Sequence, residues 1–296
     1  MTVFHATKNI TAAGNLNNAV YGEKIVDVVK GLPHYFEHGK LCSPSPKEIN
    51  PNTAFDPAFS LIYPDFEDFL AFQIVCIQPD PNEMAQFTSL FPRLNHIGLT
   101  YSGYIRDVYH QIDSAEALSK LTMYDLEREI IFFDMDFVKQ RDGYFSDKEI
   151  QAVIYGIAID AELSESQIMQ TVTIDNPETA KALGIKAGDT IEVDAGPMRA
   201  CFPRGNIKEE GYQFYEFRGK VHAVRAVELS LIDEKGWVCT VDIFRNGDDD
   251  NEFSYDEDSN MSLCEIYIPQ HLWKETTPPK IDDFIVGFVT FCGFVQ

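Results

Sequence analysis

Two aspartates, Asp134 and Asp136, stand one residue apart at the end of the apolar run that begins at Ile130. Paired carboxylates at this spacing could supply a nucleophile and an acid or base beside a divalent cation, because hard cations prefer oxygen ligands. The alternation of acidic and apolar residues is also typical of a plain strand whose acids face solvent. In that strand the core-facing residues would be Phe133, Met135 and Phe137. The periodicity favours the plain strand.

The string of four apolar residues followed by Asp134, Asp136 and Val138 resembles the first motif of the haloacid-dehalogenase-type phosphatases. That resemblance implies that Asp134 is the nucleophile, that Asp136 is the acid and base, and that both lie beside Mg²⁺. The stretch Gly247-Asp248-Asp249 would then stand for the family's later acidic metal motif. The family is built from repeated strand-helix units, whereas residues 138–247 are typical of strands and turns. A metal-dependent glycosyltransferase is a second alternative for the same pair.

A second group with metal-ligand spacing is His34, Glu37 and His38, which matches H-x-x-E-H. This pattern resembles the inverted zinc-protease motif, in which two imidazoles lie one helical turn apart. Pro33 and Gly39 bracket the group and leave room for about one turn of helix, which is shorter than those proteases need. We therefore expect a solvent-facing pair of histidines and no metal.

Seven acidic residues fall within residues 248–258, with no lysine or arginine among them. Clustered carboxylates could bind Ca²⁺, but the spacing lacks the glycine and glutamate of an EF-hand loop. A solvated hairpin loop is one alternative, and a partner-binding patch is the other, because aromatics supply anchor energy while carboxylates steer association. The predicted partner-binding residues are Asp248, Asp249, Asp250, Glu252, Phe253, Tyr255, Asp256, Glu257 and Asp258.

The acidic bias extends over the whole chain, with 24 basic and 47 acidic residues and a formal net charge of −23. Division near residue 150 gives 21 acids and 12 bases before it and 26 acids and 12 bases after it, so both halves are acidic. Such a surface repels nucleic-acid phosphates and anionic membranes and attracts basic proteins. We expect a basic protein partner and no direct contact with nucleic acid or membrane.

The six cysteines are widely spaced and form no C-x-x-C pair. Several lie in apolar, strand-like runs, a pattern that indicates reduced core thiols of a cytosolic protein. The chain begins without a signal-peptide pattern and contains no apolar run long enough to span a bilayer. These features predict a soluble, cytoplasmic protein.

The fold class expected is α+β, with a mixed α/β domain over residues 1–150 and a β-rich domain over 151–296. In the first half, helical spacing of apolar residues predicts helices at Tyr21–Lys30 and Ser114–Leu126. Between them, the proline-rich segment Leu41–Pro57 is expected to be irregular.

The second half begins with a local helix signal: Asn176 as cap, Pro177 in the first turn and Gly184 at the end. With Gly188 and the alternating strand Thr190–Val193, this segment resembles a helix-turn-strand unit of double-psi and related small β-barrels, which implies shape only.

Later runs predict strands at residues 237–244 and 264–268 and a central strand at Phe284–Val295, which is apolar on both faces. Turns are expected at residues 234–236, 246–247 and 277–279. These elements predict a mainly antiparallel β-barrel or β-sandwich of oligonucleotide-binding-fold size.

The preferred hypothesis is a non-enzymatic acidic binding protein that captures and inhibits a basic or nucleic-acid-handling protein, of the immunity or phage anti-defence type. Charge and composition motivate it, because a carboxylate surface can occupy a groove built for phosphates. No catalytic residues and no cofactor are assigned. One alternative is a Mg-dependent phosphatase or transferase that uses Asp134 and Asp136. The other is a structural component of a larger assembly, with self-association through the Phe-rich first half and a possible homo-oligomer.

Overall fold

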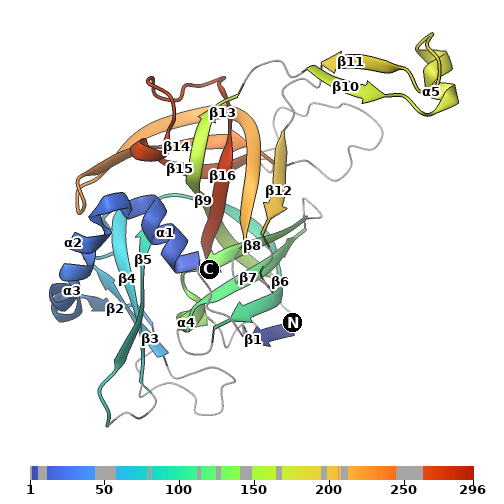
Figure 1. The fold of residues 1–296 in the computed structure, drawn as a ribbon. Coiled ribbons are helices and arrows are strands. Elements are labelled where there is room, and N and C mark those ends of the chain that lie inside the picture. The colour runs from blue at the N-terminus through green and yellow to red at the C-terminus, as the bar shows by residue number, and fades with distance from the viewer. Residues whose placement is uncertain are drawn as a thin grey trace.

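The computed structural model is mostly β, with a few short helices (Figure 1). It describes residues 2–5, 12–43, 58–78, 80, 82–111, 115–124, 128–140, 149–164, 169–194, 199–205, 207, 213–244 and 263–296. The predicted α+β mixture holds at this coarse level, while the barrel or sandwich form of the second half stays a prediction.

A mixed sheet of ten strands forms the body, in the order β1-β6-β7-β8-β16-β9-β15-β14-β13-β12. In that order the strands are Thr2–His5, Leu99–His110, Ala117–Met123, Arg128–Asp134, Phe284–Val295, Ile150–Leu163, Leu263–Pro269, Glu234–Asp242, Phe214–Leu229 and Ala200–Arg204. Further pairings join β6 to β9 and β16 to β13. Strands from both sides of residue 150 therefore share this sheet, and the domain boundary remains a prediction.

The last strand, β16, lies centrally in the sheet, as its doubly apolar sequence predicted. It pairs with β8, β9 and β13. Gly293 permits the close approach to β9, because a Cβ there would lie 2.4 Å from the carbonyl oxygen of Val153. Few side chains would fit at that position.

A smaller sheet carries the helices on one of its faces (Figure 1). Its strands are β2 (Lys40–Leu41), β3 (Ala58–Tyr63), β4 (Leu70–Ile77) and β5 (Gln86–Leu94). The helices are α1 (Ala12–Tyr21), η1 (Gly22–Lys24), α2 (Ile25–Lys30) and α3 (Leu32–His38). The predicted helix at Tyr21–Lys30 is interrupted at its start, because Gly22 has φ 51° and the chain makes a 3₁₀ turn before α2.

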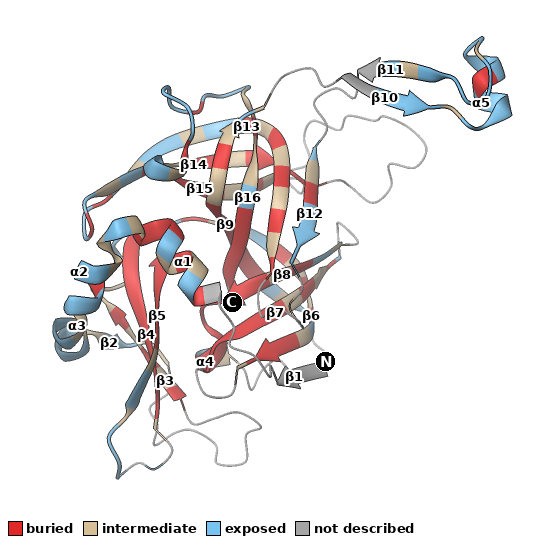
Figure 2. Ribbon diagram, viewed as in Figure 1, coloured by how far each residue is buried: buried red, intermediate tan, exposed pale blue. Residues whose placement is uncertain are grey.

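Two hydrophobic cores lie on opposite faces of the central strands. Figure 2 shows that these strands are mostly buried. The first core joins α1, β4 and β5 to one face of the large sheet, and the second core lies against the other face. Along β9, Tyr155 and Ile157 belong to the first core, while Ile154 and Ala158 belong to the second. Strands in this position need apolar side chains on both faces.

The prediction of a helix at Ser114–Leu126 was wrong, since residues 117–123 form strand β7. Leu118 packs in the first core, whereas Ala117, Leu121 and Met123 pack in the second. A strand covered on both faces does not alternate, and its apolar residues here imitate helical spacing.

The turn predicted at residues 234–236 was also misplaced. Residues 234–236 begin β14, and the chain reverses just before it, where Asp233 has φ 50°. The other two predicted turns have different outcomes. Residues 277–279 lie between β15 and β16, outside both strands, and residues 246–247 fall outside the described residues.

The helix-turn-strand unit lies in a projection that we call the arm, residues 169–194, which extends away from both sheets (Figure 1). It consists of β10 (Met169–Thr173), α5 (Pro177–Ala182) and β11 (Thr190–Asp194). Asn176 caps α5 by accepting hydrogen bonds from the amides of Glu178 and Thr179. Gly184 and Gly188, at φ 71° and 91°, make the turns that follow. The local prediction is confirmed.

The cysteines are all free thiols. Five of them are buried, as predicted for core thiols, and Cys42 is half-buried. None of the described helices is long and apolar enough to cross a membrane.

Candidate functional site

The two aspartates of the D-x-D string lie inside the protein. Strand β8 ends at Asp134, and α4 (Phe137–Gln140) begins just after Asp136. Asp134 is 3% exposed and Asp136 is 8% exposed, so the prediction of a plain strand with solvent-facing acids was wrong. Because the strand stops at Asp134, the alternation of faces does not continue to Asp136.

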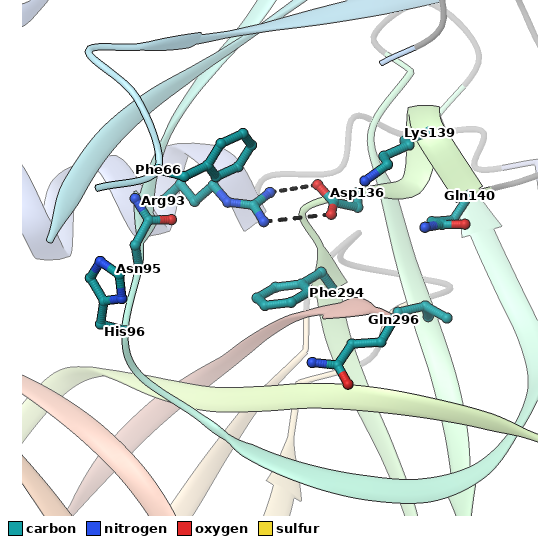
Figure 3. Close-up of a pocket in the computed structure, with 10 residues that line it drawn as sticks. Phe66, Arg93, Asn95, His96, Asp136, Lys139, Gln140, Phe294 and Gln296 are labelled. Atoms are coloured by element: carbon teal, nitrogen blue, oxygen red, sulfur yellow. Dashed lines mark hydrogen bonds and ion pairs between the residues drawn. The ribbon is translucent and has the colours of Figure 1, made fainter. Parts of the chain in front are cut away.

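Asp136 is held by an arginine from the smaller sheet, Arg93 on β5 (Figure 3). The Nη1 atom of Arg93 donates to Oδ1 of Asp136 at 2.5 Å, and Nη2 donates to Oδ2 at 3.5 Å. Gln73 completes the arrangement by accepting from Arg93 Nη1 at 3.1 Å and donating to the carbonyl of Met135 at 2.5 Å. The pair therefore ties the smaller sheet to the end of β8.

Two aromatic rings also contact the Arg93 guanidinium. Its central carbon lies 5.0 Å from the ring centroid of Phe66 and 4.9 Å from that of Phe294. Figure 3 shows one ring above and the other below the arginine. Cation–π contacts and the carboxylate together stabilise a charge that would otherwise be costly to bury.

Asp134 accepts a hydrogen bond from the Ser119 hydroxyl at 2.8 Å and another from the Asp136 amide at 3.2 Å. Among the residues that the structure describes, no group of three or more His, Cys, Asp or Glu side chains could hold a metal ion. The phosphatase hypothesis needs both carboxylates to converge on a cation with further acids. It stays untested, and the observed pairing of Asp136 with Arg93 does not favour it.

A pocket of about 400 Å³ opens beside this ion pair. Its lining residues come from the β3–β4 connection, β5 and the segment after it, α4 and the end of β16: Phe66, Arg93, Asn95, His96, Asp136, Lys139, Gln140, Phe294, Val295 and Gln296. No sequence pattern had predicted a role for Arg93. A charged residue inside the apolar run 90–94 is the signal that could have indicated a buried partner, because arginine is almost never fully buried unpaired.

The H-x-x-E-H group lies on α3, with both histidines exposed as predicted. His34 Nε2 is 2.9 Å from the Tyr63 hydroxyl, and His38 Nδ1 is 3.0 Å from the carbonyl oxygen of His34. The two imidazole centroids are 4.2 Å apart.

Glu116 is a further buried acid, and the sequence did not predict its burial. It is 7% exposed, and desolvation raises its pKa to about 7, while a hydrogen bond with Ser89 opposes the shift. A carboxyl group in this range changes charge near neutral pH.

The predicted partner-binding residues, 248–258, lie outside the described residues. The arm is described, and its exposed charged residues are Asp175, Glu178, Lys181, Lys186, Asp189 and Glu192. Searches against protein-family models, curated proteins and solved structures found no match.

Proposed function

We propose that this protein is a non-enzymatic acidic binding protein that captures and inhibits a basic or nucleic-acid-handling protein, of the immunity or phage anti-defence type. The observation that carries the proposal is the combination of a net charge of −23 with a folded arm that projects from the body (Figure 1). Carboxylates on such a surface attract a basic partner over a Debye length of about 8 Å at physiological salt.

The arm supports the proposal because it contributes little to the packing of its own chain. Ala180 is its one buried residue among those whose exposure is described, and neither hydrophobic core contains an arm residue. Val172 and Leu183 are exposed there, at 38% and 52%. A surface that combines exposed apolar side chains with carboxylates is suited to binding a protein. The charges steer association, and burial of the apolar side chains stabilises the complex.

The arm also keeps its shape through its own hydrogen bonds. The Ile174 amide donates to the Asp189 carbonyl, and the Gly188 amide donates to the Ile174 carbonyl. The Lys186 amide donates to the Asp189 carboxylate at 2.9 Å. A projection that is ordered before binding loses less conformational entropy when it binds.

Two acidic segments of the chain can therefore be tested separately: the run at 248–258 and the arm. The first variant reverses Asp248, Asp249 and Asp250 to lysine, and the second reverses Glu178 and Glu192, which accept no hydrogen bond through their side chains in the described part of the chain. A control reverses three exposed acids elsewhere, Glu37, Glu83 and Glu275.

The experiment retains tagged protein from lysate of the native host at low salt and elutes it with high salt. A basic protein that elutes near stoichiometric amounts is purified, and its association rate is measured against salt. We expect at least one of the two test variants to slow association about tenfold at low salt and to flatten its salt dependence, with a smaller effect in the control. An association rate and salt dependence that are unchanged in both test variants would contradict the proposal.

A further inference from the structure

We propose that the pocket beside the Arg93–Asp136 pair binds a small organic anion, with a carboxylate or phosphate group at one end and an apolar body at the other. This site is independent of the acidic surfaces that the proposed function uses. Its volume of about 400 Å³ lies within the range of small-molecule sites. Its lining combines apolar walls with a few converging polar groups, as such sites do.

The charge of the lining favours an anion. Arg93 and Asp136 neutralise each other in a pair whose side chains are only 5% and 9% exposed. Lys139 adds a positive charge and forms no ion pair with the acids of the described ranges. The side chains that line the pocket therefore carry a net charge of one positive unit, in contrast to the negative charge of the whole chain.

The charged donor that a ligand in the pocket can reach is the Lys139 ammonium, because Lys139 is exposed and lines the pocket. Arg93 already donates to Asp136, and its remaining Nε donor is buried from solvent. An anionic oxygen would therefore accept from Lys139, and charge-assisted hydrogen bonds are stronger than neutral ones.

Apolar contact is available from Phe66 and Phe294 (Figure 3) and from Val295, which also lines the pocket. Phe66 is 46% exposed, which leaves much of its ring free to contact a ligand. Gln140 and Gln296 bring side-chain amides to the same pocket, where they can donate to a second oxygen.

The wall that follows β5 is fixed before any ligand binds. His96 adopts φ 58°, a left-handed conformation that is uncommon for a residue other than glycine. Its ring lies 3.1 Å from the Glu67 carbonyl oxygen, and its own carbonyl accepts from Arg225 at 2.7 Å. The neighbouring Asn95 donates to the Asp68 carbonyl at 2.8 Å. These bonds hold the wall in a conformation that the backbone alone would disfavour.

Calorimetric titrations of the full chain with benzoate, phenyl phosphate, acetate and inorganic phosphate, at constant ionic strength, test the proposal. We expect benzoate or phenyl phosphate to bind at millimolar concentration or tighter. Acetate and inorganic phosphate should bind about tenfold more weakly, because they lack the apolar body. The preferred head group distinguishes a carboxylate ligand from a phosphate ligand.

The variant Lys139→Gln should weaken binding of the better probe about tenfold, and Phe66→Ala should weaken it by a similar factor. Both side chains are substantially exposed, so both variants should fold. The control Lys235→Gln removes an exposed lysine from the start of β14 and should leave binding unchanged. Equal affinity in Lys139→Gln and wild type, or no heat of binding for either aromatic probe at about 10 mM, would overturn the proposal.

Discussion

Arg93 and Asp136 join two segments of the chain that are 43 residues apart. Their side chains are almost fully buried, so each charge depends on the other for stabilisation. Removal of one member leaves an uncompensated charge inside the protein, whereas replacement of both by apolar groups removes the desolvation penalty as well. The stability effect of this pair is therefore strongly non-additive.

We predict that Asp136→Asn lowers the free energy of unfolding by about 3–5 kcal/mol, because the Arg93 charge stays buried without a carboxylate. The double variant Arg93→Met with Asp136→Leu should recover most of that loss. Urea unfolding of the wild type, Arg93→Met, Asp136→Leu and the double variant gives the coupling energy. Additive effects of the two substitutions would show that the pair is not coupled.

Glu116 should make stability depend on pH in a direction opposite to that of a paired acid. Its pKa in the folded protein is raised to about 7 from 4.5, so the folded state holds a proton that the unfolded state releases. The stabilisation that the protonated Glu116 side chain contributes to the folded state is fully present below pH 4.5. It is lost as the pH rises to about 7, the pKa in the folded protein. The loss is about 3 kcal/mol at 1.4 kcal/mol per pKa unit.

We predict that Glu116→Gln is more stable than the wild type at pH 8 and that this advantage disappears towards pH 4. The measurement is the difference in unfolding free energy between variant and wild type at several pH values. Glu37→Gln, an exposed control, should show no such trend. A difference for Glu116→Gln that does not change with pH would contradict a raised pKa.

At the level of residues, the D-x-D string shows which properties the sequence could predict and which it could not. Asp134 and Asp136 were recognised as notable, but their burial was not predicted. Their neighbours along the chain do not specify whether an acid faces water or a partner. That depends on Arg93 and Ser119, which belong to other strands. Long-range pairing of this kind leaves no local periodicity.

At the scale of elements, the predicted structure was most reliable where short-range chemistry determines conformation. The cap at Asn176 and the glycine turns at Gly184 and Gly188 act within a few residues, and the structure has them as predicted. The strand Phe284–Val295 was also predicted correctly, because twelve consecutive residues with apolar side chains on both faces fit a central strand. Strand β7 was not, because the apolar residues that enter its two cores have a spacing that imitates a helix.

The arm should be dispensable for folding. We predict that replacement of residues 169–194 by a short Gly-Ser linker changes the free energy of unfolding by no more than about 0.5 kcal/mol, since the lost surface lies outside both cores. Urea unfolding and far-ultraviolet circular dichroism give the comparison. A large loss of stability would mean that the arm packs on the body, and would weaken its assignment as a free interaction element.

Close approach of β16 and β9 gives a second prediction at this scale. Gly293→Ala places a Cβ 2.4 Å from the Val153 carbonyl oxygen, so the strands must separate locally, and we expect a loss of about 2 kcal/mol or more. Gly14→Ala is the control. It lies in α1 with no atom within 4 Å of the added Cβ, and should stabilise by about 0.5–1 kcal/mol. Chemical unfolding of both variants measures the contrast, and equal stabilities would refute the steric argument.

At the scale of the whole molecule, the topology was the least predictable feature. Strands from the first and second halves share one sheet, because β8 lies beside β16 and β6 also pairs with β9. The sequence change near residue 150 reflects local composition, which does not report which strands pair across the chain. The acidic character, by contrast, is additive over residues and was read directly from the sequence.

That charge predicts two opposite effects of salt. At a net charge of −23, repulsion between carboxylates destabilises the compact state. Salt from about 0.01 M to 0.15 M shortens the Debye length from about 30 Å to about 8 Å and screens this repulsion. We predict that the midpoint of thermal unfolding rises over this range, while association with a basic partner slows.

Scanning calorimetry in NaCl and in KCl measures the first effect, and agreement between the two salts separates screening from binding of one cation. The variant with Glu37, Glu83 and Glu275 changed to glutamine should show a smaller rise, because less charge remains to be screened. A midpoint that falls with salt would mean that surface ion pairs outweigh the net repulsion. The buried Arg93–Asp136 pair would not cause that fall, since salt screens buried charges much less than exposed ones.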